Sequence, residues 1–108
     1  MTTYRIEHFR TPKGADPFGA WFDALRDPST RQRVATRVDR LALGLFGDTK
    51  MLREGVRELR IDIGPGYRIY YAMAGRTVVL LLCACSKRTQ SDDIARAVEY
   101  WRTFQGLD

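Results

Sequence analysis

The apolar positions of residues 17–25 and 28–43 recur at three- and four-residue intervals, which is the spacing of helices with one buried face. Each segment follows an Asp-Pro pair, in which the aspartate caps a helix and the proline fits its first turn. We therefore predict a helical hairpin. Its arginines fall mostly away from the apolar stripe, and we interpret them as a solvated outer face: Arg31, Arg33, Arg37 and Arg40.

From residue 56 onward the period changes to two, which is typical of strands. Gly64-Pro65-Gly66 and Gly75 mark turns between them, and a last helix is predicted to begin at Ser91. The predicted strands are 4–9, 56–63, 67–73 and 77–85. The order β-α-α-β-β-β-α predicts an α+β fold. It has a small, mainly antiparallel sheet, with the helical hairpin and the C-terminal helix on one side.

The glycine turn at residues 64–66 predicts which residues of the second hairpin share a face. A three-residue loop sets Arg60 opposite Tyr70 and Asp62 opposite Arg68. Odd positions are then apolar and belong to the core, while the even positions form an open polar face. Salt bridges of Arg60 with Glu58 and of Arg68 with Asp62 explain the even positions equally well, so this pattern by itself leaves their role open.

The length of 108 residues predicts one compact domain, and 44% apolar with 29% charged residues excludes a disordered chain. The longest apolar run, Val78–Cys85, is far shorter than the roughly 20 residues of a membrane span. Met1–Arg10 lacks the pattern of a signal peptide. We therefore expect a cytoplasmic protein without membrane association.

Fifteen of the eighteen basic residues are arginine, and residues 28–88 hold twelve basic and five acidic side chains. Such a surface suits phosphate and nucleic acid, although solvated faces and a composition bias explain it as well. His8 is the only histidine, so a histidine-cluster metal site is excluded, and we expect no cofactor. Cys83 and Cys85 are interpreted as two small buried hydrophobic residues.

A cluster of arginines and tyrosines suits RNA cleavage by the substrate's own 2′-hydroxyl, because arginine stabilises charge on the phosphoryl oxygens. Four segments resemble those of a known family: Gly55–Arg60 (GVRELR), Gly64–Tyr71 (GPGYRIYY), Val78–Cys83 (VVLLLC) and Lys87–Gln90 (KRTQ). The helical part, with Phe18, Trp21, Leu25 and residues 31–40, is similar to that family too. In this order the four segments resemble the RelE/ParE toxin superfamily, nearest to the HigB-like addiction module killer proteins. The resemblance covers nearly the whole chain.

The resemblance implies a RelE-like fold and the toxin of a type II toxin–antitoxin system, a metal-independent endoribonuclease that cleaves mRNA on the ribosome. It assigns phosphate binding and transition-state stabilisation to Arg60 and Arg68, and Lys87 joins them as a candidate catalytic residue. Tyr70 is a candidate proton carrier by its facing alone. The candidate RNA-binding residues are Arg53, Arg57 and Arg88.

The partners implied are the ribosome, mRNA and a cognate antitoxin, a helix-turn-helix DNA-binding protein encoded next door. Operator DNA would be contacted only through that antitoxin. Two alternatives stay open: a ParE-like gyrase poison, and a catalytically silent module that binds the antitoxin and regulates the operon.

Overall fold

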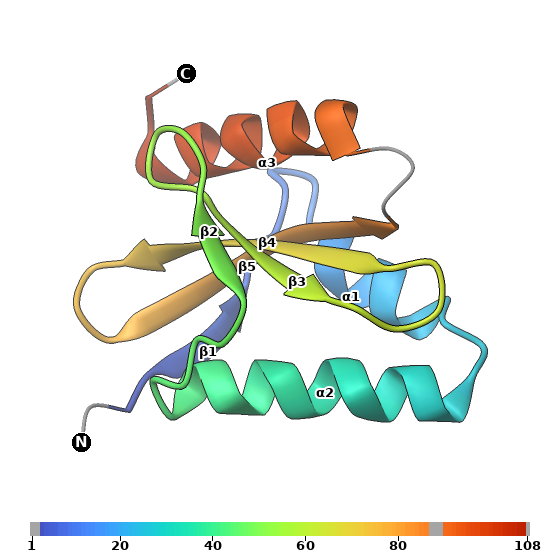
Figure 1. The fold of residues 1–108 in the computed structure, drawn as a ribbon. Helices are drawn as coiled ribbons and strands as arrows, with labels where there is room; N and C mark the ends of the chain where they lie inside the picture. Colours follow the sequence, from blue (N-terminus) through green and yellow to red (C-terminus); the bar gives the residue numbers. More distant parts are fainter. Residues whose placement is uncertain (1–2, 87–89, 108) are drawn as a thin grey trace.

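The computed structural model describes residues 3–86 and 90–107, and a five-stranded sheet forms its centre (Figure 1). The strands lie in the order β1-β5-β4-β3-β2, with β1 parallel to β5 and all other neighbours antiparallel. Their bounds are β1 Arg5–His8, β2 Thr49–Met51, β3 Arg57–Ile61, β4 Tyr67–Ala74 and β5 Val78–Ser86. The predicted α+β class and mainly antiparallel sheet are confirmed.

The helices cover both faces of this sheet, so the prediction that they share one side is wrong (Figure 1). α1 (Pro17–Asp23) and α2 (Pro28–Ala42) pack on one face, and α3 (Gln90–Gln105) packs on the other. Phe18 and Val34 belong to the first core, and Val98 and Trp101 to the second. Ala72, at an even position of β4, is fully buried because α3 packs on that face of the sheet.

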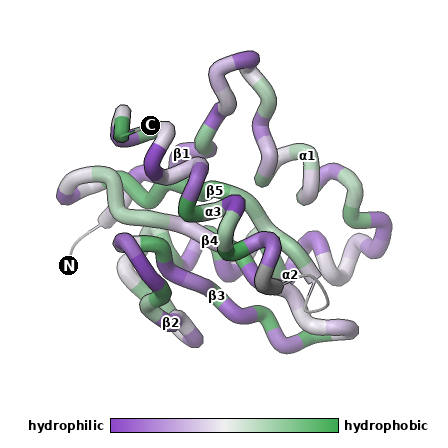
Figure 2. Tube along the Cα trace, turned by 90° about the horizontal axis from the view of Figure 1, so that it is seen from above, coloured by the Kyte–Doolittle hydropathy of each residue, from purple (hydrophilic) through white to green (hydrophobic). Residues whose placement is uncertain are grey.

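β5 is apolar at consecutive positions and contains a β-bulge. Tyr70 pairs with Cys83 but Tyr71 pairs with Leu81, so Leu82 is an extra residue and the alternation reverses there. Because helices cover both faces, side chains of either parity are buried along β5. The tube in Figure 2 is accordingly green along much of β5, whereas β3 alternates between purple and green.

The helix and strand boundaries otherwise lie close to the predicted ones, with one added strand. β2 is only three residues long and pairs with β3 at the edge of the sheet. Both hairpin helices begin at the predicted Asp-Pro pairs, and Asp16 and Asp27 accept backbone N–H groups as N-caps. α3 begins at Gln90, before the predicted cap Ser91. No helix in residues 3–86 or 90–107 is long and apolar enough to cross a membrane.

Candidate functional site

The register of β3 and β4 places Arg60 directly opposite Arg68. The connecting loop spans residues 62–66, two residues more than predicted, so the predicted pairings of Arg60 with Tyr70 and of Asp62 with Arg68 are wrong. The shift is an even number, and the division of the two strands into an odd and an even face is therefore confirmed. Two like charges face each other across the strands, an arrangement that destabilises a sheet unless something offsets it.

The predicted open face is wrong at Tyr70, which is fully buried beneath α3. Its hydroxyl lies 3.5 Å from Cys85 Sγ. Burial, and then the contact with Cys85, raises the pKa of Tyr70 above its usual range. A phenol that is shielded from solvent and bound more tightly to its proton is poorly suited to moving protons. The structure therefore argues against the predicted role of Tyr70 as proton carrier.

Glu58 offsets the repulsion between the two arginines. One oxygen, Oε1, lies 3.2 Å from Arg60 Nε and 3.4 Å from Arg68 Nε, and 2% of the Glu58 side chain is exposed. Both Nε atoms are buried, and neither finds a hydrogen-bond acceptor in suitable geometry. The carboxylate thus holds the two guanidinium groups by charge. The two buried Nε–H donors still lack a hydrogen-bond acceptor, a condition that is rare in native proteins away from functional sites.

The two arginines line a cavity of about 190 Å³ at the end of the hairpin, together with Asp48 and Asp62. Arg68 is the more enclosed, with 11% of its side chain exposed against 38% for Arg60. Asp48 and Asp62 are exposed, and among the described residues neither forms an ion pair. Water screens these rim carboxylates, whereas the arginines share one buried carboxylate. The cavity therefore offers a cationic wall to a small anion such as a phosphoryl group.

The other predicted site residues lie elsewhere or outside the described residues. Arg57 is on the opposite face of β3, with its guanidinium carbon 5.9 Å from the centre of the Phe46 ring. Arg53 is exposed in the turn between β2 and β3. Lys87 and Arg88 are outside the described residues, and directly follow β5, whose last residue pairs with Tyr67. The fold thus unites Arg60 and Arg68 alone among the predicted residues that it describes.

Two further residues complete the site. Glu58 was expected only as one possible salt-bridge partner, although its even position already placed it on the arginine face. Asp48 was not predicted, because its contribution depends on β2 folding back beside β3, where the Arg60 backbone N–H donates to the Asp48 carbonyl oxygen at 2.9 Å. The predicted burial of Cys83 and Cys85 as free thiols is confirmed. Burial raises the pKa of Cys83 to about 12.

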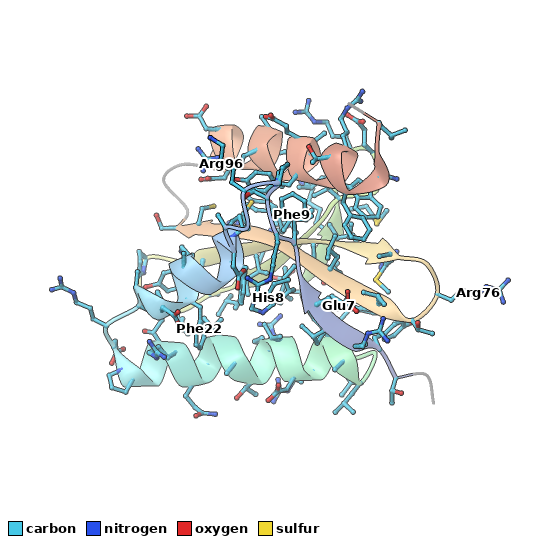
Figure 3. The ribbon with its side chains drawn as sticks, turned by 180° about the vertical axis from the view of Figure 1, so that it is seen from behind. Glu7, His8, Phe9, Phe22, Arg76 and Arg96 are labelled. Atoms are coloured by element: carbon cyan, nitrogen blue, oxygen red, sulfur yellow. The ribbon has the colours of Figure 1, made fainter. Side chains whose placement is uncertain are left out.

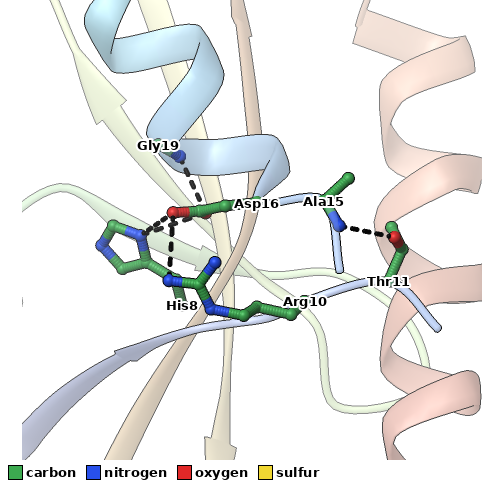
Figure 4. Close-up of polar contacts among 6 residues, drawn as sticks. All are labelled: His8, Arg10, Thr11, Ala15, Asp16 and Gly19. Carbon is green, nitrogen blue, oxygen red and sulfur yellow. Dashed lines mark hydrogen bonds and ion pairs between the residues drawn. The ribbon is translucent and has the colours of Figure 1, made fainter. Parts of the chain in front are cut away.

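A second charged cluster lies on the other side of the molecule, at the end of β1. His8 and Phe9 point to opposite faces of the sheet (Figure 3). Asp16 Oδ2 lies 2.8 Å from His8 Nδ1 and 4.0 Å from Arg10 Nη2, and Asp16 Oδ1 accepts the Gly19 N–H (Figure 4). Burial opposes ionisation of Asp16, but these hydrogen bonds and charges outweigh it and lower the pKa.

Neither cluster has the composition of a metal centre. In the part of the chain that the structure describes, no group of three or more His, Cys, Asp or Glu side chains is placed to hold a metal ion.

Comparison with known proteins identifies the family. Residues 20–99 match the phage-derived Gp49-like protein family. This chain belongs to the Gp49-like family. It is also 40% identical, over 80 residues, to an uncharacterised protein of Haemophilus influenzae, a match that covers 74% of this chain and 81% of the relative. The Gp49-like family is associated with addiction-module killers, the toxins of toxin–antitoxin systems, and membership implies an antitoxin partner in general.

Proposed function

We propose that this Gp49-like protein is a RelE/ParE-type, HigB-like toxin that cleaves ribosome-bound mRNA and thereby inhibits translation in the cytoplasm. The observation that carries the proposal is the pair of facing guanidinium groups, Arg60 and Arg68, around the buried carboxylate of Glu58. An anionic ligand group in the 190 Å³ cavity would relieve the repulsion between them further, beside the Glu58 carboxylate. The scissile phosphate of an RNA strand supplies such a group.

The chemistry follows from this placement. The 2′-hydroxyl of the substrate loses its proton and attacks the neighbouring phosphorus, the bond from phosphorus to the 5′-oxygen breaks, and that oxygen takes up a proton. Arg60 and Arg68 stabilise the negative charge that grows on the non-bridging oxygens. The products are a 2′,3′-cyclic phosphate and a 5′-hydroxyl, and no step requires a metal ion.

We assign Tyr70 no part in proton transfer, because it is fully buried and its pKa is raised above the usual range. Lys87 retains its proposed catalytic role, because β5, which precedes it in the sequence, pairs Cys85 with Arg68 near its last residue, Ser86. Arg88 is proposed to bind RNA beside it. Glu58 acts as a positioning residue, since its carboxylate contacts both arginines and 2% of its side chain reaches solvent.

Growth arrest in a bacterial host tests the proposal. Expression of the wild-type chain should stop growth, Arg68→Gln should relieve the arrest, and Tyr70→Phe should leave it intact. Soluble expression and urea unfolding of the purified variants provide the folding control. Full toxicity of a folded Arg68→Gln variant would overturn the site. Inhibition of DNA gyrase by the wild-type protein, with cellular mRNA left intact, would instead support the gyrase-poison alternative.

A further inference from the structure

A larger hollow lies between α2 and the end of β3, beside the arginine cavity. This groove has a volume of about 650 Å³. Arg33, Arg37 and Arg40 line one wall from α2, and residues 61–63 line the other. The three arginines are spaced by four and three residues, so they share one face of the helix. From Arg33 to Arg40 the three residues span about 10 Å along the axis of α2.

Several arginines of the described residues are held by contacts within the chain. Arg31, on the same helix, donates to the Asp23 and Leu25 carbonyl oxygens. By contrast, no carboxylate of the described residues lies within ion-pair distance of the three groove arginines. Arg33 and Arg40 are exposed, as predicted for a solvated outer face, and with Arg37 they also border a groove whose far wall is the sheet.

A glycine in the loop after α2 lies beside one of these side chains. A Cβ atom at Gly47, whose φ is +64°, would lie 2.8 Å from Arg37 Nη2. The absence of a side chain at this position therefore leaves room for the Arg37 guanidinium. The groove also adjoins the arginine cavity, because Asp62 lines both. The two hollows share the Asp62 carboxylate, and their basic side chains are the three α2 arginines in the groove and Arg60 and Arg68 in the cavity.

We propose that this groove binds the phosphate backbone of a single RNA strand next to the phosphate held by Arg60 and Arg68. The inference rests on the proposed function and adds the path of the substrate. Arginine binds phosphate through a planar pair of donors, and a row of cations along one helix face suits successive phosphates of an extended strand. The neutral lining residues also carry hydrogen-bond donors to phosphate oxygens: Ser29, Gln32 and Thr36.

The lining favours nucleic acid over a protein partner. Protein interfaces depend on aromatic and large apolar anchors in their centre. No aromatic side chain lines the groove, and its two apolar residues are buried Ile61 and half-buried Ile63. None of the exposed large hydrophobic residues of the described chain lines the groove; they are Leu43, Leu45, Met51, Phe104 and Leu107.

Binding of a short 2′-O-methyl RNA of about 12 nucleotides, followed by fluorescence anisotropy across a salt series, tests the groove. This probe has no free 2′-hydroxyl, so cleavage does not interfere. The groove variant replaces Arg33, Arg37 and Arg40 with glutamine. The control variant makes the same charge change at exposed Arg10, Lys13 and Arg76. Arg76 points away from the body of the molecule at the β4–β5 turn (Figure 3).

The groove variant should bind at least roughly tenfold more weakly at about 0.1 M salt. Its salt slope should fall by about 2, since each phosphate contact to a single strand contributes about 0.7. The control variant should bind within about twofold of wild type if net charge is a minor factor at this salt concentration. If the groove variant is unstable in urea unfolding, Arg33→Gln with Arg40→Gln serves instead, because both side chains are exposed.

Equal affinities of the groove and control variants would overturn the proposal. So would a groove variant that keeps its RNA affinity but no longer binds the antitoxin, because the groove would then take a protein. A different result would separate this inference from the proposed function. If the groove variant loses RNA binding while the wild-type protein leaves ribosome-bound mRNA uncut, the groove stands as an RNA site and the proposed cleavage fails.

Discussion

Two carboxylates of this chain each contact two basic side chains, and their surroundings differ. Glu58 contacts two arginines with 2% of its side chain exposed, whereas Asp16 contacts a histidine and an arginine with 22% exposed. Asp16 also caps a helix, and nearby solvent screens any excess charge. Around Glu58 two arginines share one buried carboxylate, and they line a cavity together with the exposed Asp48 and Asp62. We therefore interpret the Asp16 cluster as a structural contact and the Glu58 cluster as part of an anion-binding site.

The largest expected effect comes from removing the buried carboxylate. Glu58→Ala should lower the free energy of unfolding by about 3–5 kcal/mol, because two partly buried guanidinium groups would then face each other unpaired. Glu58→Gln keeps the shape and one acceptor oxygen and should cost less. Urea unfolding of both variants measures the difference. A loss below about 1 kcal/mol for Glu58→Ala would mean that the two arginines move apart at little cost. That result would contradict the claim that Glu58 holds them together.

The corresponding change in the exposed cluster should be smaller. Asp16→Ala removes the N-cap of α1 and the partner of His8, and should lower the free energy of unfolding by about 1 kcal/mol. The same urea measurement gives the value. If Asp16→Ala costs as much as Glu58→Ala, burial is not what separates the two clusters.

The smallest effect is the acid dependence of the exposed cluster. The pKa of Asp16 is lowered in the folded chain, so its ionised form adds stability above the ordinary pKa of 3.8. That contribution disappears as the pH falls through the lowered folded value. Asp16→Asn keeps a capping oxygen without the charge. Between about pH 5 and pH 2 it should lose less stability than wild type. Parallel curves for the two proteins would show that the charge of Asp16 is not linked to folding.

The sequence predicted the division of β3 and β4 into two faces, because alternation is a property of each strand alone. The pairing of residues was wrong because it depends on loop length, and Gly64-Pro65-Gly66 suggested a loop of three residues where the structure has five. The facing of β5 was not predictable, since the bulge at Leu82 reverses its alternation. β2 escaped prediction because three residues are too few to show a period.

The candidate site was predictable to a similar degree. Parity and the family resemblance both selected Arg60 and Arg68. Tyr70 shares their parity, but its burial depends on α3 crossing that part of the face, which no local pattern in β4 reveals. Arg57 was assigned to RNA binding although its odd position already placed it on the other face. The role of the α2 arginines depends on the tertiary position of the helix beside β3.

The chemical nature of the RNA ends tests the central claim most directly. Purified protein with programmed ribosomes should cut mRNA to leave a 2′,3′-cyclic or 3′-phosphate and a 5′-hydroxyl, and Arg68→Gln should reduce cleavage by at least roughly a hundredfold, as for loss of a transition-state charge contact. Magnesium stays in every reaction, because ribosomes need it. The chemical group at the RNA end, and not metal removal, is therefore the measured result. A 3′-hydroxyl end, or undiminished cleavage by folded Arg68→Gln, would contradict the account.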